Sequence, residues 1–319
     1  MIIAIAGRRA ATTRILLDAV LRDVSHSYTD SVEAADVLLV FDGSVDLAGL
    51  SRDTVVVAYG DDATVAAATA DSTATVVTVG LSPANGVRAD AVVTTIDGTR
   101  FDLVSGVRRA RVAVGIVGES VVPLALAALA ASAAAGVATA DAIAALSAVT
   151  AGAPGDMRIE RRVGGIVVID DTSDASPLST ADALKTLAAV TVDGTRSVAV
   201  LGELDLDGDA DPVEAREAHD RIGRLVVRLN VSRLVVVGQQ ARHIHNAAGL
   251  EGSWDGESVL VDTADEAYDL LNDSEFAQNG RTPTVVLVKS GPTASLGVLA
   301  DRIASSDAPS TNDHRTATA

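Results

Sequence analysis

The first residues of the chain form a loop with some features of a phosphate site. The apolar run at 2–6 predicts a buried strand, and it is followed by Gly7, Arg8, Arg9, Ala10, Ala11, Thr12 and Thr13. This segment has the register of a G-x-x-G-K-T-T loop, in which glycine lets backbone N–H groups surround the phosphates and lysine supplies the charge. Alanine stands at the second glycine and at the lysine. We favour an ordinary strand–turn–helix, with an arginine contact to phosphate as the alternative.

Carboxylates close a later predicted strand. Asp170 and Asp171 end an apolar run, and Asp174 follows in the next turn. Carboxylates at the carboxyl end of a parallel strand can hold Mg²⁺ or a ribose hydroxyl. The alternative is a helix cap and a solvated turn before Pro177. Both interpretations stay open, and Lys289, at the end of another predicted strand, is uninformative by itself.

Other polar patterns fail on their spacing. The segment Gly118-Glu119-Ser120 lacks the glycines of a dinucleotide loop and the G-x-S-x-G of a nucleophile elbow. The acidic run at 205–211 lacks the glycine and the glutamate that an EF-hand needs at its sixth and twelfth positions. His243 and His245 point to different faces of a predicted helix, and His219 stands alone. We therefore expect no metal site.

The elements that position these residues alternate in type. Short β-branched runs alternate with alanine-rich stretches, a pattern typical of buried parallel strands and crossover helices. Strands are expected at 2–6, 37–41, 54–58, 75–79, 91–96, 100–104, 111–117, 165–169, 197–201, 233–237, 258–261 and 284–289. Helices are expected at 12–22, 63–70, 123–135, after 139, at 179–189, 212–229, after 238, at 263–272 and at 295–304.

The chain of 319 residues predicts more than one domain. A Gly/Pro cluster at 150–155 interrupts the helical pattern. We expect one α/β domain over 1–155, a second over 156–304, and a disordered tail over 305–319, which is rich in Ser, Thr, Asp and Pro.

Composition excludes several classes of protein. The formal net charge of −18 argues against a nucleic-acid or anionic-membrane surface. The absence of cysteine excludes disulfide scaffolds, zinc ribbons and thiol catalysis. No basic segment of a signal peptide opens the chain, and the uncharged stretch at 121–140 is mostly alanine, which favours a buried helix. We expect a cytoplasmic protein without membrane insertion.

In order along the chain, these segments resemble the Mur ligase family, and most of all its D-alanyl-D-alanine-adding branch. The run from Asp170 to Ser179 resembles the family's D-D-S-Y-N-A-N-P-x-S. Residues 198–204 resemble its V-L-G-D-M, 217–223 its H-x-x-I-G, 234–238 its V-x-V-G and 286–291 its V-L-V-K-G-S. Residues 76–80, 89–90 and 98–103 resemble the end of its central domain, and 6–13 stand where T-G-x-x-G-K-T-T would begin.

The resemblance implies an α/β fold, with a degenerate P-loop-type central domain followed by a Rossmann-like C-terminal domain. It also implies that the family's N-terminal UDP-binding domain is lacking. Mur ligases join an amino acid or peptide to a UDP-linked cell-wall precursor, using ATP to form an acyl phosphate.

Several functional positions of the family are altered here. The phosphate-loop lysine is Ala11, and the arginine after the interdomain P-G is Asp156, with Arg158 as a displaced alternative. The family's tyrosine is Ser173. The histidine and both asparagines of its G-x-H-N-x-x-N are missing from 118–124. By resemblance the candidate ligand-binding residues are Asp170, Asp171, Asp174 and Lys289, and the degenerate phosphate loop comprises Gly7, Arg8, Arg9, Thr12 and Thr13; no catalytic residue is assigned.

Three hypotheses follow from these changes. The leading one is a homologue without ATP-dependent ligation, which needs no cofactor and binds a ligand or a cell-wall biosynthesis or division protein. The second is a working ATP- and Mg-dependent ligase that uses Arg8, Arg9 and the Asp170/Asp171 pair in an altered site. The third is a half-enzyme that receives its UDP-binding domain from a partner chain.

Overall fold

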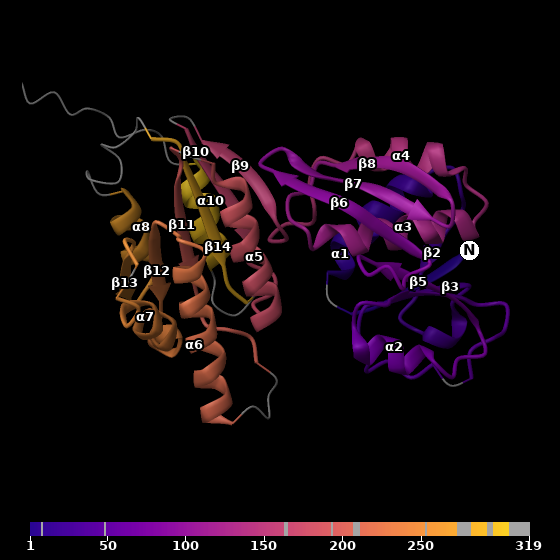
Figure 1. Cartoon of the computed structure of the whole chain (residues 1–319), viewed down its shortest axis with the longest axis horizontal. Helices are drawn as coiled ribbons and strands as arrows, with labels where there is room; N and C mark the ends of the chain where they lie inside the picture. The colour runs from indigo at the N-terminus through magenta and orange to yellow at the C-terminus, as the bar shows by residue number, and fades with distance from the viewer. Residues whose placement is uncertain are drawn as a thin grey trace, which may run out of the picture. The chain divides into compact units, whose positions relative to one another are not determined.

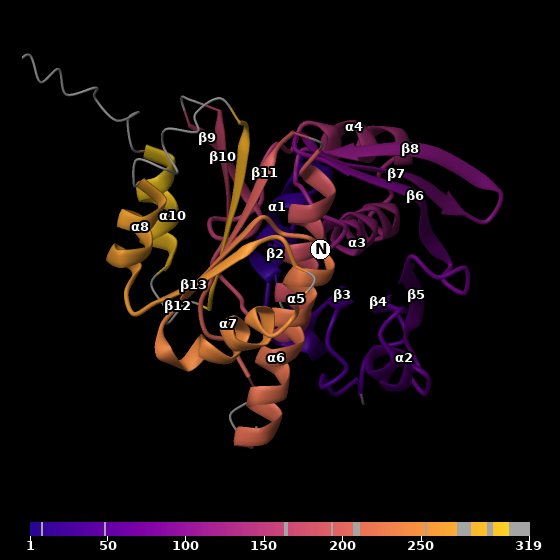
Figure 2. The ribbon, with the colours of Figure 1, turned by 60° about the vertical axis from the view of Figure 1, so that its left-hand side comes forward.

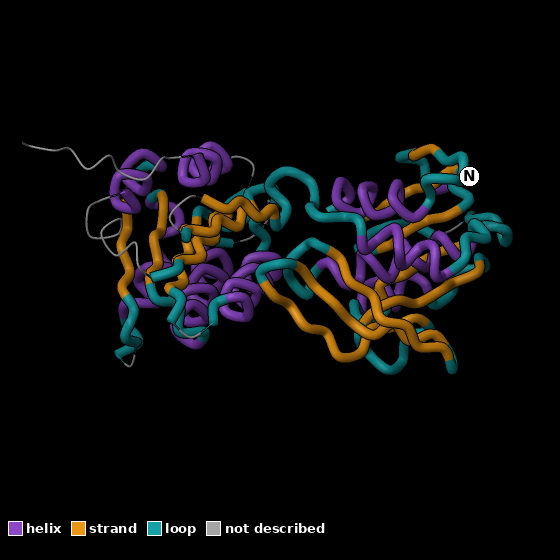
Figure 3. The backbone as a smooth tube through the Cα atoms, turned by 90° about the horizontal axis from the view of Figure 1, so that it is seen from above, coloured by secondary structure: helices purple, strands orange, loops and turns teal. Residues whose placement is uncertain are grey.

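The chain folds into two α/β units, Met1–Arg158 and Ile159–Ala319 (Figure 1). The computed structural model describes every residue except 8, 48, 163–164, 193, 207–210, 253, 273–281, 292–295 and 306–319. The predicted disordered tail therefore lies outside the described residues from 306 onward. In each unit the strands form a sheet that is packed against helices (Figure 3).

The first unit contains an eight-stranded sheet in the order β2-β1-β3-β4-β5-β6-β7-β8. Its strands are β1 (Ile2–Ala6), β2 (Ser27–Tyr28), β3 (Val37–Val40), β4 (Val55–Tyr59), β5 (Thr75–Gly80), β6 (Val87–Thr95), β7 (Gly98–Ser105) and β8 (Arg108–Val114). Its helices are α1 (Ala10–Val20), α2 (Ala63–Thr69), α3 (Val121–Ala134) and α4 (Thr139–Ser147), with a short 3-10 helix at Val32–Ala34.

The pattern of parallel strands and crossover helices does not extend to the end of this sheet. Pairing is parallel from β2 to β6, but β6, β7 and β8 form an antiparallel meander. Their connections, residues 96–97 and 106–107, are too short for the crossover that parallel strands require. Gly98 and Gly106 take positive φ angles of 134° and 58° beside these turns.

Helix α3 is the core helix of the first unit. Most of its side chains are buried, and it packs against α1, α4 and strands β4 and β5 (Figure 2). Its alanines let the neighbouring helices approach closely. It ends at Ala134, well short of residue 140, and no helix among the described residues is long and apolar enough to cross a membrane.

The second unit contains a six-stranded sheet in the order β13-β12-β11-β14-β10-β9. Its strands are β9 (Arg158–Arg162), β10 (Ile166–Asp171), β11 (Arg196–Leu201), β12 (Arg233–Val237), β13 (Glu257–Val261) and β14 (Thr284–Lys289). Its helices are α5 (Pro177–Val190), α6 (Pro212–Arg228), α7 (Arg242–Gly249), α8 (Ala264–Asn272) and α10 (Leu296–Ser305), with a 3-10 helix at Gln239–Ala241. Helices α8 and α10 cover one face, and α5, α6 and α7 the other (Figure 2).

Strand β14 lies between β10 and β11, and all three run parallel. In this register Lys289 is paired with Asp171 on one side and with Leu201 on the other. Asp171 and Lys289 therefore meet at the carboxyl edge of the sheet, where ligands bind in folds of this kind.

A histidine ties the edge strand of the first unit to α1. His26 Nε2 lies 2.9 Å from Asp18 Oδ1, and its Nδ1 lies 2.9 Å from the Val24 carbonyl oxygen. The Tyr28 hydroxyl donates to the same Asp18 oxygen at 2.7 Å. Both ring nitrogens face acceptors, so the protonated imidazolium fits this position. The carbonyl contact and then Asp18 raise the pKa of His26 above its ordinary value of 6.5.

This raised pKa predicts a pH-dependent stability. The contribution of His26 is fully present below about pH 6.5, its ordinary value, and is lost as pH rises through the higher pKa of the folded state. We expect Asp18→Asn to lower the calorimetric unfolding midpoint at about pH 5.5 and much less at about pH 8.5. The exposed Asp23, changed to Asn, is the matched control. An equal loss for Asp18→Asn at both pH values would contradict this assignment.

Candidate functional site

The predicted phosphate loop lies between β1 and α1, and its backbone is tightly constrained. Gly7 has a φ of 122°, and a Cβ there would lie 2.9 Å from the Cβ of Phe41, so only glycine fits. Arg9 adopts a left-handed conformation with φ of 62° and precedes the first residue of α1. That conformation costs a non-glycine residue about 1–2 kcal/mol, which other contacts must offset. Arg8 lies outside the described residues.

The contacts of the Arg9 guanidinium offset that cost. Its Nη1 donates to Ser120 Oγ at 2.7 Å and lies 3.3 Å from Asp156 Oδ1. The side chains of Arg9 and Asp156 are only 12% and 5% exposed. The start of α1, the start of α3 and the segment that follows α4 therefore meet at one buried ion pair.

The two threonines of the loop are also committed to internal contacts. Thr12 Oγ1 donates to Asp156 Oδ2 and accepts from the Ala153 N–H at 2.9 Å. Thr13 Oγ1 donates to the Arg9 carbonyl at 3.0 Å. Both threonines are buried. Hydroxyls that a nucleotide loop would direct at phosphate or metal stabilise the turn instead.

These residues do not fit a nucleotide–magnesium group. The methyl group of Ala11 replaces the lysine ammonium, and the guanidinium of Arg9 is already neutralised by Asp156. A triphosphate would have to displace that carboxylate before it could pair with Arg9, the cation of this loop that the structure describes. The described part of the chain contains no group of three or more His, Asp or Glu side chains placed to hold a metal ion.

The predicted residues of the second unit form a different cluster. Lys289 Nζ donates to Asp171 Oδ2 at 2.5 Å and to Ser179 Oγ at 2.7 Å. The side chains of Lys289 and Asp171 are each 1% exposed. Ser179 lies in the first turn of α5, which begins with Pro177 and is capped by Ser176. Ser179 carries the third contact of this cluster, and sequence reasoning assigned it no role.

The other predicted carboxylates of the second unit have separate local contacts. Asp170 Oδ1 accepts from Thr172 Oγ1 at 2.7 Å, and Asp174 Oδ1 accepts from the Ser176 N–H at 2.9 Å. Asp174 thus shapes the turn before α5. The expectation of an aspartate N-cap is wrong, because the N-cap of this helix is Ser176. These contacts do not bring the carboxylates of Asp170, Asp171 and Asp174 to one shared point.

Two buried hydroxyls of the second unit have spare hydrogen-bonding capacity. Thr180 Oγ1 and Ser290 Oγ are buried, and neither has a hydrogen-bond partner among the described residues. Each follows a residue of the cluster directly in sequence. Buried polar groups are costly when unpaired, so these two hydroxyls reduce the stability of the unit.

His219 has a structural role. Its Nδ1 lies 2.7 Å from the Ala215 carbonyl oxygen, and its Nε2 accepts from the Leu204 N–H at 3.3 Å. In this arrangement Nδ1 is the donor and Nε2 the acceptor. The histidine thereby fixes the segment after β11 to α6.

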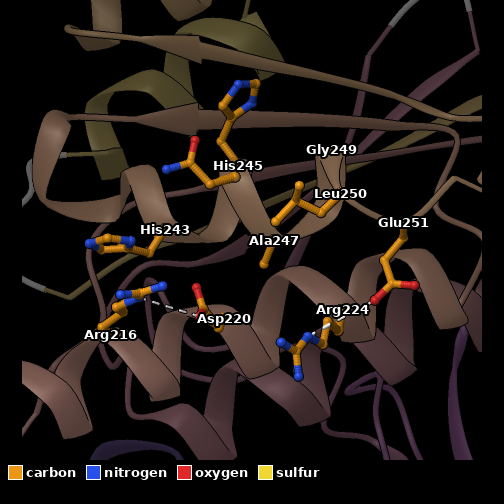
Figure 4. Close-up of a pocket in the computed structure, with 10 residues that line it drawn as sticks. Arg216, Asp220, Arg224, His243, His245, Ala247, Gly249, Leu250 and Glu251 are labelled. Atoms are coloured by element: carbon orange, nitrogen blue, oxygen red, sulfur yellow. Dashed lines mark ion pairs between the residues drawn. The ribbon is translucent and has the colours of Figure 1, made fainter.

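A groove of about 740 Å³ lies between α6 and α7 (Figure 4). Within it Arg216 lies 3.7 Å from Asp220, and Arg224 lies 4.0 Å from Glu251. Burial, and then the charge of Arg242, lower the pKa of His243. His245 points away from His243 and contacts Ser258 Oγ at 2.7 Å (Figure 4). The charges of this groove are balanced in pairs, and its histidines diverge.

The only two lysines of the chain provide a matched test of the second cluster. Lys289→Met should lower the free energy of unfolding by about 3 kcal/mol, because it leaves the Asp171 carboxylate buried without its cation. Lys185, in an exposed pair with Asp182, is the control, and Lys185→Met should cost about 0.5 kcal/mol or less.

Fluorescence of Trp254, the only tryptophan, reports urea unfolding of the second unit alone. Equal unfolding midpoints for the two lysine variants would show that the buried pair makes no special contribution.

No protein-family model matches the chain. It is similar to the UDP-N-acetylmuramoyl-tripeptide–D-alanyl-D-alanine ligases of Mycobacterium bovis and Mycobacterium tuberculosis, each 36% identical over 219 residues. These matches cover 65% of this chain and 42% of each relative, so the chain matches less than half the length of these curated proteins.

Solved structures show the same fold. MurF from Acinetobacter baumannii superposes with a TM-score of 0.78 at 18% identity, covering 96% of this chain and 77% of that one. MurF from Thermotoga maritima, solved in complex with ADP, has a TM-score of 0.74 at 13% identity, covering 95% and 79%. The two α/β units thus have the architecture of Mur ligase central and C-terminal domains, as the sequence predicted.

Proposed function

Since this chain is a homologue of the Mur ligases and shares their fold, we propose that it acts in peptidoglycan precursor metabolism by binding, without ATP-dependent ligation. The ligand would be a cell-wall precursor or a protein of cell-wall biosynthesis or division. The relatives are named for a UDP-linked muramoyl tripeptide and D-alanyl-D-alanine, which makes these two compounds the first probes.

The observation that carries the proposal is the state of the loop after β1. Phosphoryl transfer depends almost wholly on positioning and on neutralising charge. Here the lysine position holds Ala11, and the remaining described cation, Arg9, is paired with Asp156. The positive charge of Arg9, which would otherwise be available to neutralise phosphate, is therefore already neutralised by a carboxylate of the protein.

The second unit supports a binding role. Asp171 and Lys289 end paired strands at the edge of the sheet where folds of this kind bind ligands. Thr180 and Ser290, which follow Ser179 and Lys289 in the chain, have buried hydroxyls without a hydrogen-bond partner among the described residues. A peptide carboxylate or amide could meet these hydroxyls without any nucleotide.

A second candidate function is a working ligase with an altered nucleotide site. The identity of 36% to proteins named as ligases favours it, together with the presence of Asp170, Asp171 and Lys289. Under this alternative Arg8 and Arg9 would contact the phosphates, and ATP and Mg²⁺ would be required.

Measurements of nucleotide binding and of turnover distinguish a binding protein without ligation from a working ligase. We expect titration calorimetry of the full chain with Mg–ATP to give no micromolar binding. We also expect no phosphate release when the UDP-linked muramoyl tripeptide and D-alanyl-D-alanine are added. The Mycobacterium tuberculosis relative is the positive control in the same assay. Turnover that requires these substrates and is abolished by Asp171→Ala would establish the alternative.

A further inference from the structure

The carboxylate of Asp156 lies where the loop after β1 would receive an anion. It is contacted by the Arg9 guanidinium, at 3.3 Å, and by the Thr12 hydroxyl. Both donors belong to the turn that starts α1. Helix α1 has no acidic residue in its first turn. Its N-cap residue, Arg9, makes no side-chain capping hydrogen bond within the described part of the chain.

A cation, a hydroxyl and a helix N-terminus are the groups by which strand–turn–helix loops bind phosphate. Here the first two of these groups contact one internal carboxylate, and both belong to the first turn of α1 or its N-cap. The negative charge of Asp156 therefore matches the chemistry of the loop, as an external oxyanion would.

The position of the carboxylate is fixed by the segment that carries it. The Asp156 N–H donates to the Ala153 carbonyl at 3.0 Å, and the Ala153 N–H donates to Thr12 Oγ1 at 2.9 Å. A Cβ at Gly152 would lie 2.7 Å from the Asp156 carbonyl oxygen and 3.0 Å from Thr12 Oγ1. This close approach holds the turn against α1, and with it the acid.

We propose that Asp156 is an internal anion that closes this loop, and that removal of its carboxylate opens a site for inorganic phosphate. The proposal deepens the proposed function and rests on it in one respect, namely that the wild-type loop holds no nucleotide. Asp156 is then the residue that excludes anions, and the alanines at 10 and 11 are a separate defect.

The test compares phosphate binding by the full chain and its variants. Asp156→Ala and the isosteric Asp156→Asn are titrated with inorganic phosphate, and the unfolding midpoint is followed at constant ionic strength set with KCl. We expect a phosphate-dependent rise for Asp156→Ala that is absent in the wild type. A charge-assisted contact to a buried cation contributes a factor of about ten or more in affinity, so that is the expected gain in binding.

The matched control removes the cation as well. Arg9→Gly suits the backbone, because glycine adopts a φ of 62° without strain. The double variant Arg9→Gly/Asp156→Ala should show no response to phosphate.

Each outcome bears on the proposal. A folded Asp156→Ala protein that binds phosphate no better than wild type overturns it, and so does wild-type binding of equal strength. If Asp156→Ala is unfolded, phosphate-dependent refolding of either variant supports the proposal, and no response from both variants overturns it. Trp254 fluorescence shows whether the second unit is intact in each case. Mg–ATP turnover by the wild type would refute the proposed function, and with it the premise that the wild-type loop holds no nucleotide, whereas the phosphate titration of the variants tests the role of Asp156 itself.

Discussion

The first unit depends on one buried ion pair. Arg9 and Asp156 are separated by almost the whole length of the unit, yet their side chains meet out of water and also engage Ser120 and Thr12. Taking both charges out of solvent is costly, and only mutual neutralisation with further hydrogen bonds offsets it. The pair thereby joins the first and last elements of the unit. It also holds a left-handed arginine in a turn that would otherwise favour glycine.

The second unit also has a buried ion pair, which lies at the carboxyl edge of its sheet. Lys289 and Asp171 face each other across adjacent parallel strands, and Ser179 adds a contact from α5. In both units the polar groups that parallel sheets gather at this edge are largely satisfied from within. The two units differ in one respect: the second unit also contains two buried hydroxyls that have no hydrogen-bond partner among the described residues.

Much of the fold could be predicted because hydrophobic period and length determine it locally. The strands Ile2–Ala6, Arg233–Val237 and Thr284–Lys289 were predicted to the residue, since each is a short β-branched run between polar residues. The two-residue edge strand β2 and strand β9, with the polar sequence RIERR, carry no such signal. The direction of β7 and β8 depends on the length of the connections between the strands. The sequence pattern of the strands carries no information about this direction.

The candidate sites were less predictable, because their contacts join distant segments. Gly7, Thr12 and Thr13 were identified as a loop, but nothing local to them indicates that Asp156 supplies the anion. The loss of an arginine at that position was noticed from the resemblance, whereas the role of the aspartate depends on tertiary structure. Lys289 and Asp171 were each found as strand ends, and only the strand order places them together.

The closed loop has a consequence for how such a protein could change over generations. Replacing Ala11 with lysine by itself would add a second cation near Asp156, which is already paired with Arg9. The carboxylate of Asp156 would still occupy the position of the phosphate. Replacing Asp156 first would leave the guanidinium of Arg9 without its counter-charge. Each single substitution toward a phosphate-binding loop therefore carries an electrostatic cost while the Arg9–Asp156 pair is present.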